Sequence, residues 1–416
     1  MIPETSNKAK MRARILASSA YQEGCKSLFE IFAQSREARR DSKKLLDIQE
    51  SLVGSFWNLK EQKERLKQEK NQLGLGVAKR LINVLMQIAD SIVWRSLKYD
   101  RILIQLMAEH SKTGEPDETI FKDFSIAEKI VNEEQVTVLI NDLTTILRYG
   151  DLTVIGKENI SLLETKYGKA TARNTRAVRQ RKTREQQIAF MNVGYRFRED
   201  KHEFLYKADT PLATYHSNVK DAINKAKQTG YCQILLSDCL GVEITCPNEI
   251  KSELPTRHLF ENEDNILLFS NLLLFENTAP GIAPYGIFPF DDETCFDLIT
   301  NNIVITGLLH LENLKKHHER FGLYLELPDL SEYDRFSSTI EKKRFIESVR
   351  FIVGDGNYSI GLPLFNIARI CSEFLTEESI IKTNLRLINL IKGLKIPSDN
   401  ISSFFIGHKN ESALWT

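Results

Sequence analysis

The stretch from Gly150 to Lys169 constrains the fold more than any other, because it has the pattern of a β-hairpin. Its first apolar run, DLTVI, is rich in β-branched residues, and its second, ISLLETK, becomes charged only at its end. Between the two runs, GKEN supplies residues that favour a turn. The pattern predicts two short strands, with Asp151 heading the first and Glu164 and Lys166 ending the second.

The charged residues of this predicted hairpin are suited to metal chemistry. Side chains two residues apart share a face of a strand, so we expect Glu164 and Lys166 to lie together and Thr165 to point the other way. Two carboxylates from neighbouring strands supply the hard oxygen ligands that Mg²⁺ takes. A lysine beside them can orient or help to deprotonate a metal-bound water. The sequence therefore indicates a site for Mg²⁺, or for Mn²⁺ in its place.

This arrangement resembles the core of the PD-(D/E)XK nuclease superfamily, in which an acid begins one strand and Glu-x-Lys lies on the next. The resemblance covers roughly residues 77–193 and departs from the family pattern at Gly150, which stands where proline is common. It implies an α/β fold with a restriction-endonuclease-like mixed sheet flanked by helices. It also implies three catalytic residues and a metal held by two of them and a backbone carbonyl. The catalytic residues would be Asp151, Glu164 and Lys166, and the metal ligands Asp151, Glu164 and the carbonyl of Thr165.

Glu-x-Lys is a weak pattern by itself, since it recurs in this chain. The other copies begin at Glu61, Glu199, Glu249 and Glu341, and they lie in a polar helical run, in charge clusters, or after a run broken by proline. Only Glu164 ends a strand-like run whose neighbour is headed by an aspartate. Position in the chain therefore separates this copy from the others.

A basic segment follows the hairpin. From Lys166 to Arg184 the chain has eight basic residues and no acidic one. Such a cluster neutralises phosphates with release of counterions and reads no base sequence. The run from Ala172 to Val193 has the pattern of a helix, and the resemblance puts a helix beside the active site. The candidate nucleic-acid-binding residues are Lys169, Arg173, Arg176, Arg179, Gln180, Arg181 and Lys182.

Two alternatives stay open for this segment. Gln180 is the residue we expect to reach the site, but Arg179 or Gln187 would serve equally well. The segment also fits a solvated basic helix that binds nothing.

The run from Val77 has apolar residues at helical spacing and is expected to form the first helix of the nuclease core. Asp90 interrupts its apolar stripe. Some superfamily members add a carboxylate from this helix to the metal, so Asp90 is a further candidate ligand, although a position on the polar face explains it equally well. Asp100 and Glu109 are weaker alternatives to Asp90.

A second helix is expected between residues 125 and 149. Ser125 with Glu128 three residues later is a capping-box pattern that would begin it. Its apolar residues continue to the end of the run, so the helix would deliver the chain to the first catalytic strand. Gly150 would then permit a sharp reversal.

Composition and length limit the remaining possibilities. The chain has 56 Lys and Arg residues against 56 Asp and Glu residues, so nucleic acid would have to bind a local patch. No apolar stretch approaches the length of a membrane span, and the N-terminus lacks an apolar signal core. We therefore expect a cytoplasmic protein without a membrane partner.

Three regions are predicted. Residues 1–76 favour helix until Gly74 and Gly76, and would serve oligomerisation or cover the core. Residues 77–198 would form the nuclease core, and residues 199–416 an α+β accessory domain of unknown role. In the last region we expect strands at 231–238, 240–246, 265–275 and 322–327, and helices at 217–227, 308–318, 342–349 and 380–392.

The cysteines and histidines of the chain give no metal motif. The six cysteines include no C-x-x-C pair, so we expect buried reduced thiols. His317, His318 and Glu319 are adjacent and would point in different directions on a helix, so we expect solvated helical residues.

Together these observations predict a metal-dependent nuclease that hydrolyses phosphodiester bonds, with DNA favoured over RNA because most relatives of this kind act on DNA. Analogy adds bacterial restriction or anti-phage defence, with a second copy of the chain or a defence-system protein as a candidate partner. The alternatives are a catalytically silent nucleic-acid-binding module and a protein-assembly module with the same fold.

Overall fold

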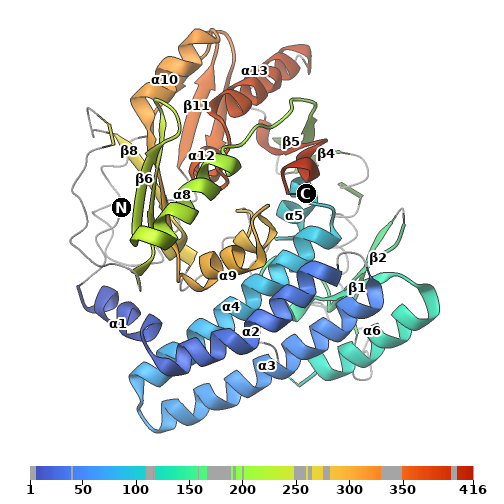
Figure 1. The fold of residues 1–416 in the computed structure, drawn as a ribbon. Helices are drawn as coiled ribbons and strands as arrows, with labels where there is room; N and C mark the ends of the chain where they lie inside the picture. Colours follow the sequence, from blue (N-terminus) through green and yellow to red (C-terminus); the bar gives the residue numbers. More distant parts are fainter. Residues whose placement is uncertain are drawn as a thin grey trace.

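A computed structural model gives a mixed α/β architecture, in which long helices and several small sheets pack together (Figure 1). No helix in the described part of the chain is long and apolar enough to cross a bilayer. The described residues are 6–38, 41–108, 116, 118–157, 159–165, 189–190, 194–198, 201–247, 259–260, 265–274, 282–328, 349–394 and 401–415.

The N-terminal region is helical, as predicted. It comprises α1 (Ser6–Leu16), α2 (Ser19–Ala38), α3 (Ser42–Gln68) and α4 (Gln72–Ser96). The side chain of Asn71 caps α4 by accepting a hydrogen bond from Gly74 N at 2.9 Å. Gly74 and Gly76 therefore lie inside α4, and the break expected at these glycines is wrong, because the cap falls before them. In Figure 1, α2 and α3 lie alongside α4.

The predicted hairpin is confirmed. β2 (Leu152–Ile155) and β3 (Ile160–Leu163) are antiparallel, and β1 (Thr137–Ile140) pairs with β2 on its other side. The turn is closed by a hydrogen bond of 2.9 Å from Gly156 N to Asn159 O. Two helices, α5 (Arg101–Met107) and α6 (Ile120–Glu134), precede β1 in the chain. The 3₁₀ turn η1 (Asn141–Leu143) lies between β1 and β2.

The helix predicted between residues 125 and 149 is wrong in its second half and at its start. α6 begins at Ile120, so Ser125 lies within it, and it ends before Gln135, which adopts a left-handed conformation with φ of 53°. The β-branched run after Gln135 forms β1 instead. Residues 144–149 then return the chain to β2 without regular structure.

A glutamine from α3 helps to explain why β1 forms a strand although, among the described residues, only β2 pairs with it. The side chain of Gln49 donates to Val138 O and accepts from Ile140 N, both at 2.8 Å. A neighbouring strand would form its hydrogen bonds with these same backbone groups. The amide thus replaces a strand at the edge of the sheet.

The rest of the chain adds three sheets. β6-β7-β9-β8 and β10-β11-β12 are antiparallel, whereas β13 is parallel to β5 in the sheet β13-β5-β4. The strands are β4 (Tyr195–Arg198), β5 (Lys201–Ala208), β6 (Tyr231–Leu235), β7 (Leu240–Thr245), β8 (Ile266–Ser270), β9 (Val304–His310), β10 (Tyr324–Glu326), β11 (Arg350–Gly354), β12 (Ser359–Pro363) and β13 (Ile401–His408). The helical segments are α8 (His216–Thr229), η3 (Asn271–Leu274), η4 (Tyr285–Ile287), α9 (Asp292–Thr300), α10 (Leu311–Arg320), α12 (Leu364–Ser372), α13 (Glu377–Leu394) and η7 (Glu411–Leu414).

Most elements predicted after residue 199 are confirmed within a few residues at their ends. The strand expected at 265–275 is wrong in its second half, because β8 ends at Ser270 and Asn271–Leu274 form η3. The helix expected from Leu308 is wrong in its first three residues, because β9 continues to His310 between two neighbouring strands. The helix expected at 342–349 lies outside the described residues except for Val349. All six cysteines are buried and form no disulfide, as expected. His318 is buried rather than solvated, and its Nδ1 lies 2.9 Å from Leu314 O.

The main hydrophobic core extends across both predicted region boundaries. It runs from Ile15 in α1 through α4 and the hairpin to Trp415 near the C-terminus. A second cluster lies among β10, β11, β12, α12 and α13. The division of the chain into three regions stays a prediction.

Four buried charges tie α5 to the C-terminal half. Arg101 Nη2 lies 2.8 Å from both carboxylate oxygens of Glu373, and its Nε lies 2.6 Å from Glu411 Oε1. Arg369 contacts the same two carboxylates, each at 2.9 Å. Burial alone would raise the pKa of Glu373, but the positive charges of Arg101 and Arg369 lower it. Two positive and two negative charges therefore balance inside the core.

We predict that Arg101→Met lowers the free energy of unfolding by about 3–5 kcal/mol, because it leaves buried carboxylates without a full set of partners. Urea denaturation measures the change. Lys382→Met, which breaks the exposed pair with Glu378, is the control and should change stability by no more than about 0.5 kcal/mol. Equal effects of the two substitutions would contradict a special role for the buried charges.

Two buried histidines predict a loss of stability in mild acid. Burial lowers the pKa of both His216 and His408 to about 4. An unfolded histidine has a pKa of about 6.5, so between about pH 6.5 and 4 the unfolded chain binds protons that the folded chain does not. The free energy of unfolding should therefore fall as the pH drops through this window. Denaturation at several pH values should show a smaller fall for His408→Gln, and an unchanged fall would contradict the assignment.

Candidate metal site at the hairpin

The entry into β2 requires glycine at position 150. Gly150 has a φ of +71°, and a Cβ there would lie 2.6 Å from Leu163 O. The next residue, Asp151, donates its N–H to the same carbonyl at 2.8 Å. The close approach of these two strand ends brings Asp151 to the start of β2, where the sequence pattern predicted it.

The buried amide of Asn141 holds this entry in place. Its Nδ2 donates to Tyr149 O at 2.7 Å and to Gly150 O at 3.2 Å, and its Oδ1 accepts from Thr153 Oγ1 at 2.8 Å. Its backbone N–H donates to Asp151 O at 3.0 Å. The side chain and the backbone N–H of Asn141 thus together fix the chain from Tyr149 to Asp151.

Asp151 and Glu164 lie near each other at the end of the hairpin. The last pair in the register of the two strands is Leu152 with Leu163, and Asp151 and Glu164 are the residues that flank this pair. The regular pairing stops there, because the N–H of Asp151 bonds to Leu163 O. Burial raises the pKa of Asp151, hydrogen bonds from Thr165 oppose this, and the negative charges of Asp142 and Glu164 raise it further.

Thr165 turns toward Asp151, contrary to the prediction that it points away from the acidic face. Its N–H and its hydroxyl contact Asp151 Oδ2 at 2.6 Å and 2.9 Å. β3 ends at Leu163, so the alternation of side chains along a strand no longer applies at Thr165.

Asp123 is a carboxylate of this site that sequence reasoning missed. It lies on α6, is 2% exposed, and its Oδ1 contacts the hydroxyl of Thr165. A hydroxyl carries one hydrogen, so Thr165 donates to either Asp123 or Asp151 at a given moment. No local pattern signals this contact, because it depends on how α6 packs on the hairpin.

The other candidate ligands have structural partners. Asp90 is 5% exposed, and its two oxygens accept from Thr145 N at 2.8 Å and from Thr145 Oγ1 at 2.5 Å. It therefore anchors the segment between β1 and β2, and its role as a metal ligand stays a prediction. Asp100 caps α5 and pairs with Lys207 at 2.6 Å.

The basic residues predicted for this site begin at Lys166, whereas the described residues of the hairpin end at Thr165. The residues outside the described ranges are Glu109, Lys166, Lys169, Arg173, Arg176, Arg179, Gln180, Arg181, Lys182 and Gln187.

The described carboxylates suit an ion that keeps much of its water. Within the described ranges, no three His, Cys, Asp or Glu donors around Asp151 come close enough together to hold one ion. Mg²⁺ is commonly bound by one or two carboxylates with waters filling its other positions. The pair Asp151 and Glu164 therefore suits a hydrated ion better than an ion whose ligands all come from the protein.

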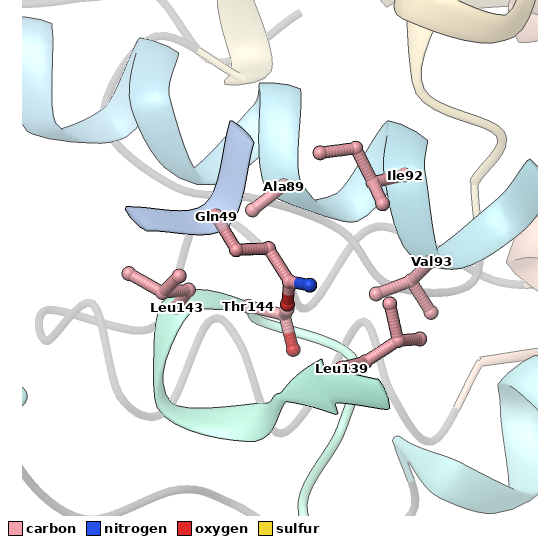
Figure 2. A pocket seen from close by; sticks show the side chains of 7 residues that line it. All are labelled: Gln49, Ala89, Ile92, Val93, Leu139, Leu143 and Thr144. Carbon is pink, nitrogen blue, oxygen red and sulfur yellow. The ribbon is translucent and has the colours of Figure 1, made fainter. Parts of the chain in front are cut away.

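The interior behind the hairpin is packed and holds no ligand-sized cavity at the place shown in Figure 2. A narrow gap there, between α4 and β1, is too tight for a water molecule. The side chain of Gln49 extends into it, beside apolar residues from both elements (Figure 2). The lining residues are Gln49, Ala89, Ile92, Val93, Leu139, Leu143 and Thr144.

We predict that Asp151→Asn raises the melting temperature near neutral pH, because it removes a half-buried charge that Asp142 and Glu164 repel, while its side-chain oxygen can still accept from Thr165. A raised carboxyl pKa costs stability once the group ionises, so the gain should shrink as the pH falls. Thermal denaturation at several pH values measures this. The exposed Asp47→Asn is the control, and a loss of stability in Asp151→Asn alone would contradict the prediction.

The comparisons with known proteins assign the chain to no family. Comparisons of the chain with protein-family models, with curated proteins and with solved structures give no match. Any function must therefore be inferred from the residues and geometry described above.

Proposed function

We propose that the chain is a metal-dependent nuclease that hydrolyses phosphodiester bonds, with DNA favoured over RNA. Asp151 and Glu164 would hold Mg²⁺ or Mn²⁺ together with the carbonyl of Thr165, and Lys166 would position the attacking water. The observation that carries the proposal is the end of the hairpin, where Asp151 and Glu164 flank the last register pair and their charges interact.

The order of elements around the hairpin supports the proposal. A long buried helix, α4, precedes three antiparallel strands in the order β1-β2-β3, and the acids lie at the start of β2 and just after β3. This is the order that a restriction-endonuclease-like core would have, with α5 and α6 inserted between α4 and β1.

The electrostatics of the site also favour a cation. Asp151, Glu164 and Asp142 carry negative charges that interact at short range, and Asp123 is linked to Asp151 through Thr165. The N–H of Thr165 donates to Asp151 Oδ2, and its hydroxyl contacts the same oxygen, which orients the carboxylate and leaves Oδ1 for a ligand. A divalent ion bound there would supply an activated water and offset charge on the scissile phosphate.

The chain's own residues would have distinct tasks in the reaction. Asp151 and Glu164 orient the ion, Thr165 keeps Asp151 in one rotamer, and Lys166 neutralises charge that builds up on the phosphate. The basic residues after Lys166 would bind the phosphates on either side. A second copy of the chain or a defence-system protein is the partner proposed for restriction or anti-phage activity.

A catalytically silent module with the same fold is the second candidate. One observation favours it: Asp151 Oδ2 already accepts from the N–H of Thr165 and contacts its hydroxyl, so this oxygen has partners without a metal. Such a module would bind nucleic acid or a protein partner without cleaving anything.

The test is cleavage by the purified full-length chain of plasmid, linear DNA, single-stranded DNA and RNA, with Mg²⁺ or Mn²⁺ and then with EDTA. We predict metal-dependent cleavage that Asp151→Ala, Glu164→Ala and Lys166→Ala each lower by at least about a hundredfold.

Glu61→Ala is the matched control, since Glu61 begins another Glu-x-Lys on the exposed face of α3. It should cleave at the wild-type rate. Equal cleavage by the wild type and Asp151→Ala would exclude this site, and cleavage of no substrate would favour the silent module.

A further inference from the structure

A second group of metal-ligating side chains lies away from the hairpin, at the turn between β6 and β7. Asp238 and Cys239 belong to this turn, and His317 lies on α10. One donor atom from each residue can be chosen so that all three lie within 4.8 Å of one another. In Figure 1, α10 and the hairpin strand β2 are far apart, so this group is distinct from the proposed nuclease site.

We propose that Asp238, Cys239 and His317 bind a Zn²⁺-class transition-metal ion. A thiolate, an imidazole and a carboxylate form a donor set that suits Zn²⁺ or Co²⁺ and not Mg²⁺ or Ca²⁺. Zinc lies about 2.0–2.3 Å from such donors, so donors in a tetrahedral shell are roughly 3.3–3.7 Å apart. The three donor atoms lie within 4.8 Å of one another, so small movements of the side chains would bring them to these distances.

The backbone holds the turn ready for such an ion. Asn313 Nδ2 donates to Asp238 O at 2.7 Å, and Cys239 O accepts from His310 N at 2.8 Å. Ser237 Oγ accepts from Cys239 N at 3.1 Å and from Leu240 N at 2.9 Å. These contacts fix the turn to the beginning of α10, the helix that carries His317.

The imidazole of His317 already faces Asp238. Its Nε2 lies 2.8 Å from Asp238 Oδ1 and 3.2 Å from Arg320 Nη1. One ring nitrogen cannot donate to a carboxylate and accept from a guanidinium at the same time, so only one of these contacts is made at a time. An ion between His317 and Asp238 would bind the same ring nitrogen and carboxylate, while the exposed Arg320 can turn to solvent.

The charges of the three ligands suit a dication. Cys239 is buried, and a thiol binds a metal as the thiolate, so its proton would leave when the ion binds. The thiolate and Asp238 would then balance the charge of the ion. The side chains of His317 and Asp238 are 20% and 55% exposed, so water can reach the ion at a fourth position.

The experiment uses the full-length protein without an affinity tag, first freed of metal with a chelator. Addition of Co²⁺ should give a thiolate-to-metal charge-transfer band that saturates at one ion per chain, and Zn²⁺ should remove it. Calorimetry in buffers of different ionisation enthalpy should show release of the Cys239 proton when Zn²⁺ binds.

Two variants and one control decide the outcome. Cys239→Ser should abolish the band, and His317→Gln, at a partly exposed position that tolerates change, should weaken Zn²⁺ binding by at least about tenfold. Cys232→Ser, which changes a buried cysteine of β6 in the same sheet, should leave band and affinity unchanged.

The proposal is overturned if the wild type gives no charge-transfer band, or if His317→Gln binds Zn²⁺ as tightly as the wild type. A plain ion pair between His317 and Asp238 would then explain the contact. The result does not depend on the proposed nuclease, because binding is measured without a nucleic-acid substrate.

Discussion

The pairing of Arg101 and Arg369 with Glu373 and Glu411 is the interaction on which the arrangement of this chain most depends. Arg101 belongs to α5, and its partners lie some three hundred positions further along the chain, as separations of 272 and 310 residues show. Charges removed from water are tolerated only when the geometry of their partners is good. The two halves of the chain must therefore meet in one register, and the extended hydrophobic core around them can form only in that register.

The hairpin is likewise held by polar side chains from outside its strands. Gln49 bonds the outer edge of β1, Asn141 fixes the entry into β2, and Asp90 anchors the segment between those two strands. Each is buried, so the loss of any one would leave unsatisfied backbone groups in the interior. A sheet of three four-residue strands has few hydrogen bonds between its strands, and these side chains add further hydrogen bonds to its backbone.

The sequence allowed prediction of the parts of the fold that depend on neighbouring residues. The β-branched runs on either side of GKEN led to the hairpin and to the positions of Asp151 and Glu164. The strand β1 was mistaken for helix because the run VTVLI is apolar and short, and its strand state depends on Gln49, ninety residues away. Asp123, Thr165 and the group around Cys239 could not be found for the same reason, since α6 and α10 bring their side chains together only after packing. The residues from Lys166 to Arg184 that would complete the nuclease site lie outside the described ranges and stay predictions.

The hydroxyl of Thr165, which stands between Asp123 and Asp151, ties the hairpin to α6. With a single hydrogen to offer, it donates to one of the two carboxylates at a time, and the other then lacks that hydrogen bond. A cation that drew Asp151 away from Thr165 would leave this hydrogen to Asp123. The buried side of α6 would therefore respond to binding at the end of the hairpin, although only Asp151 lies on it.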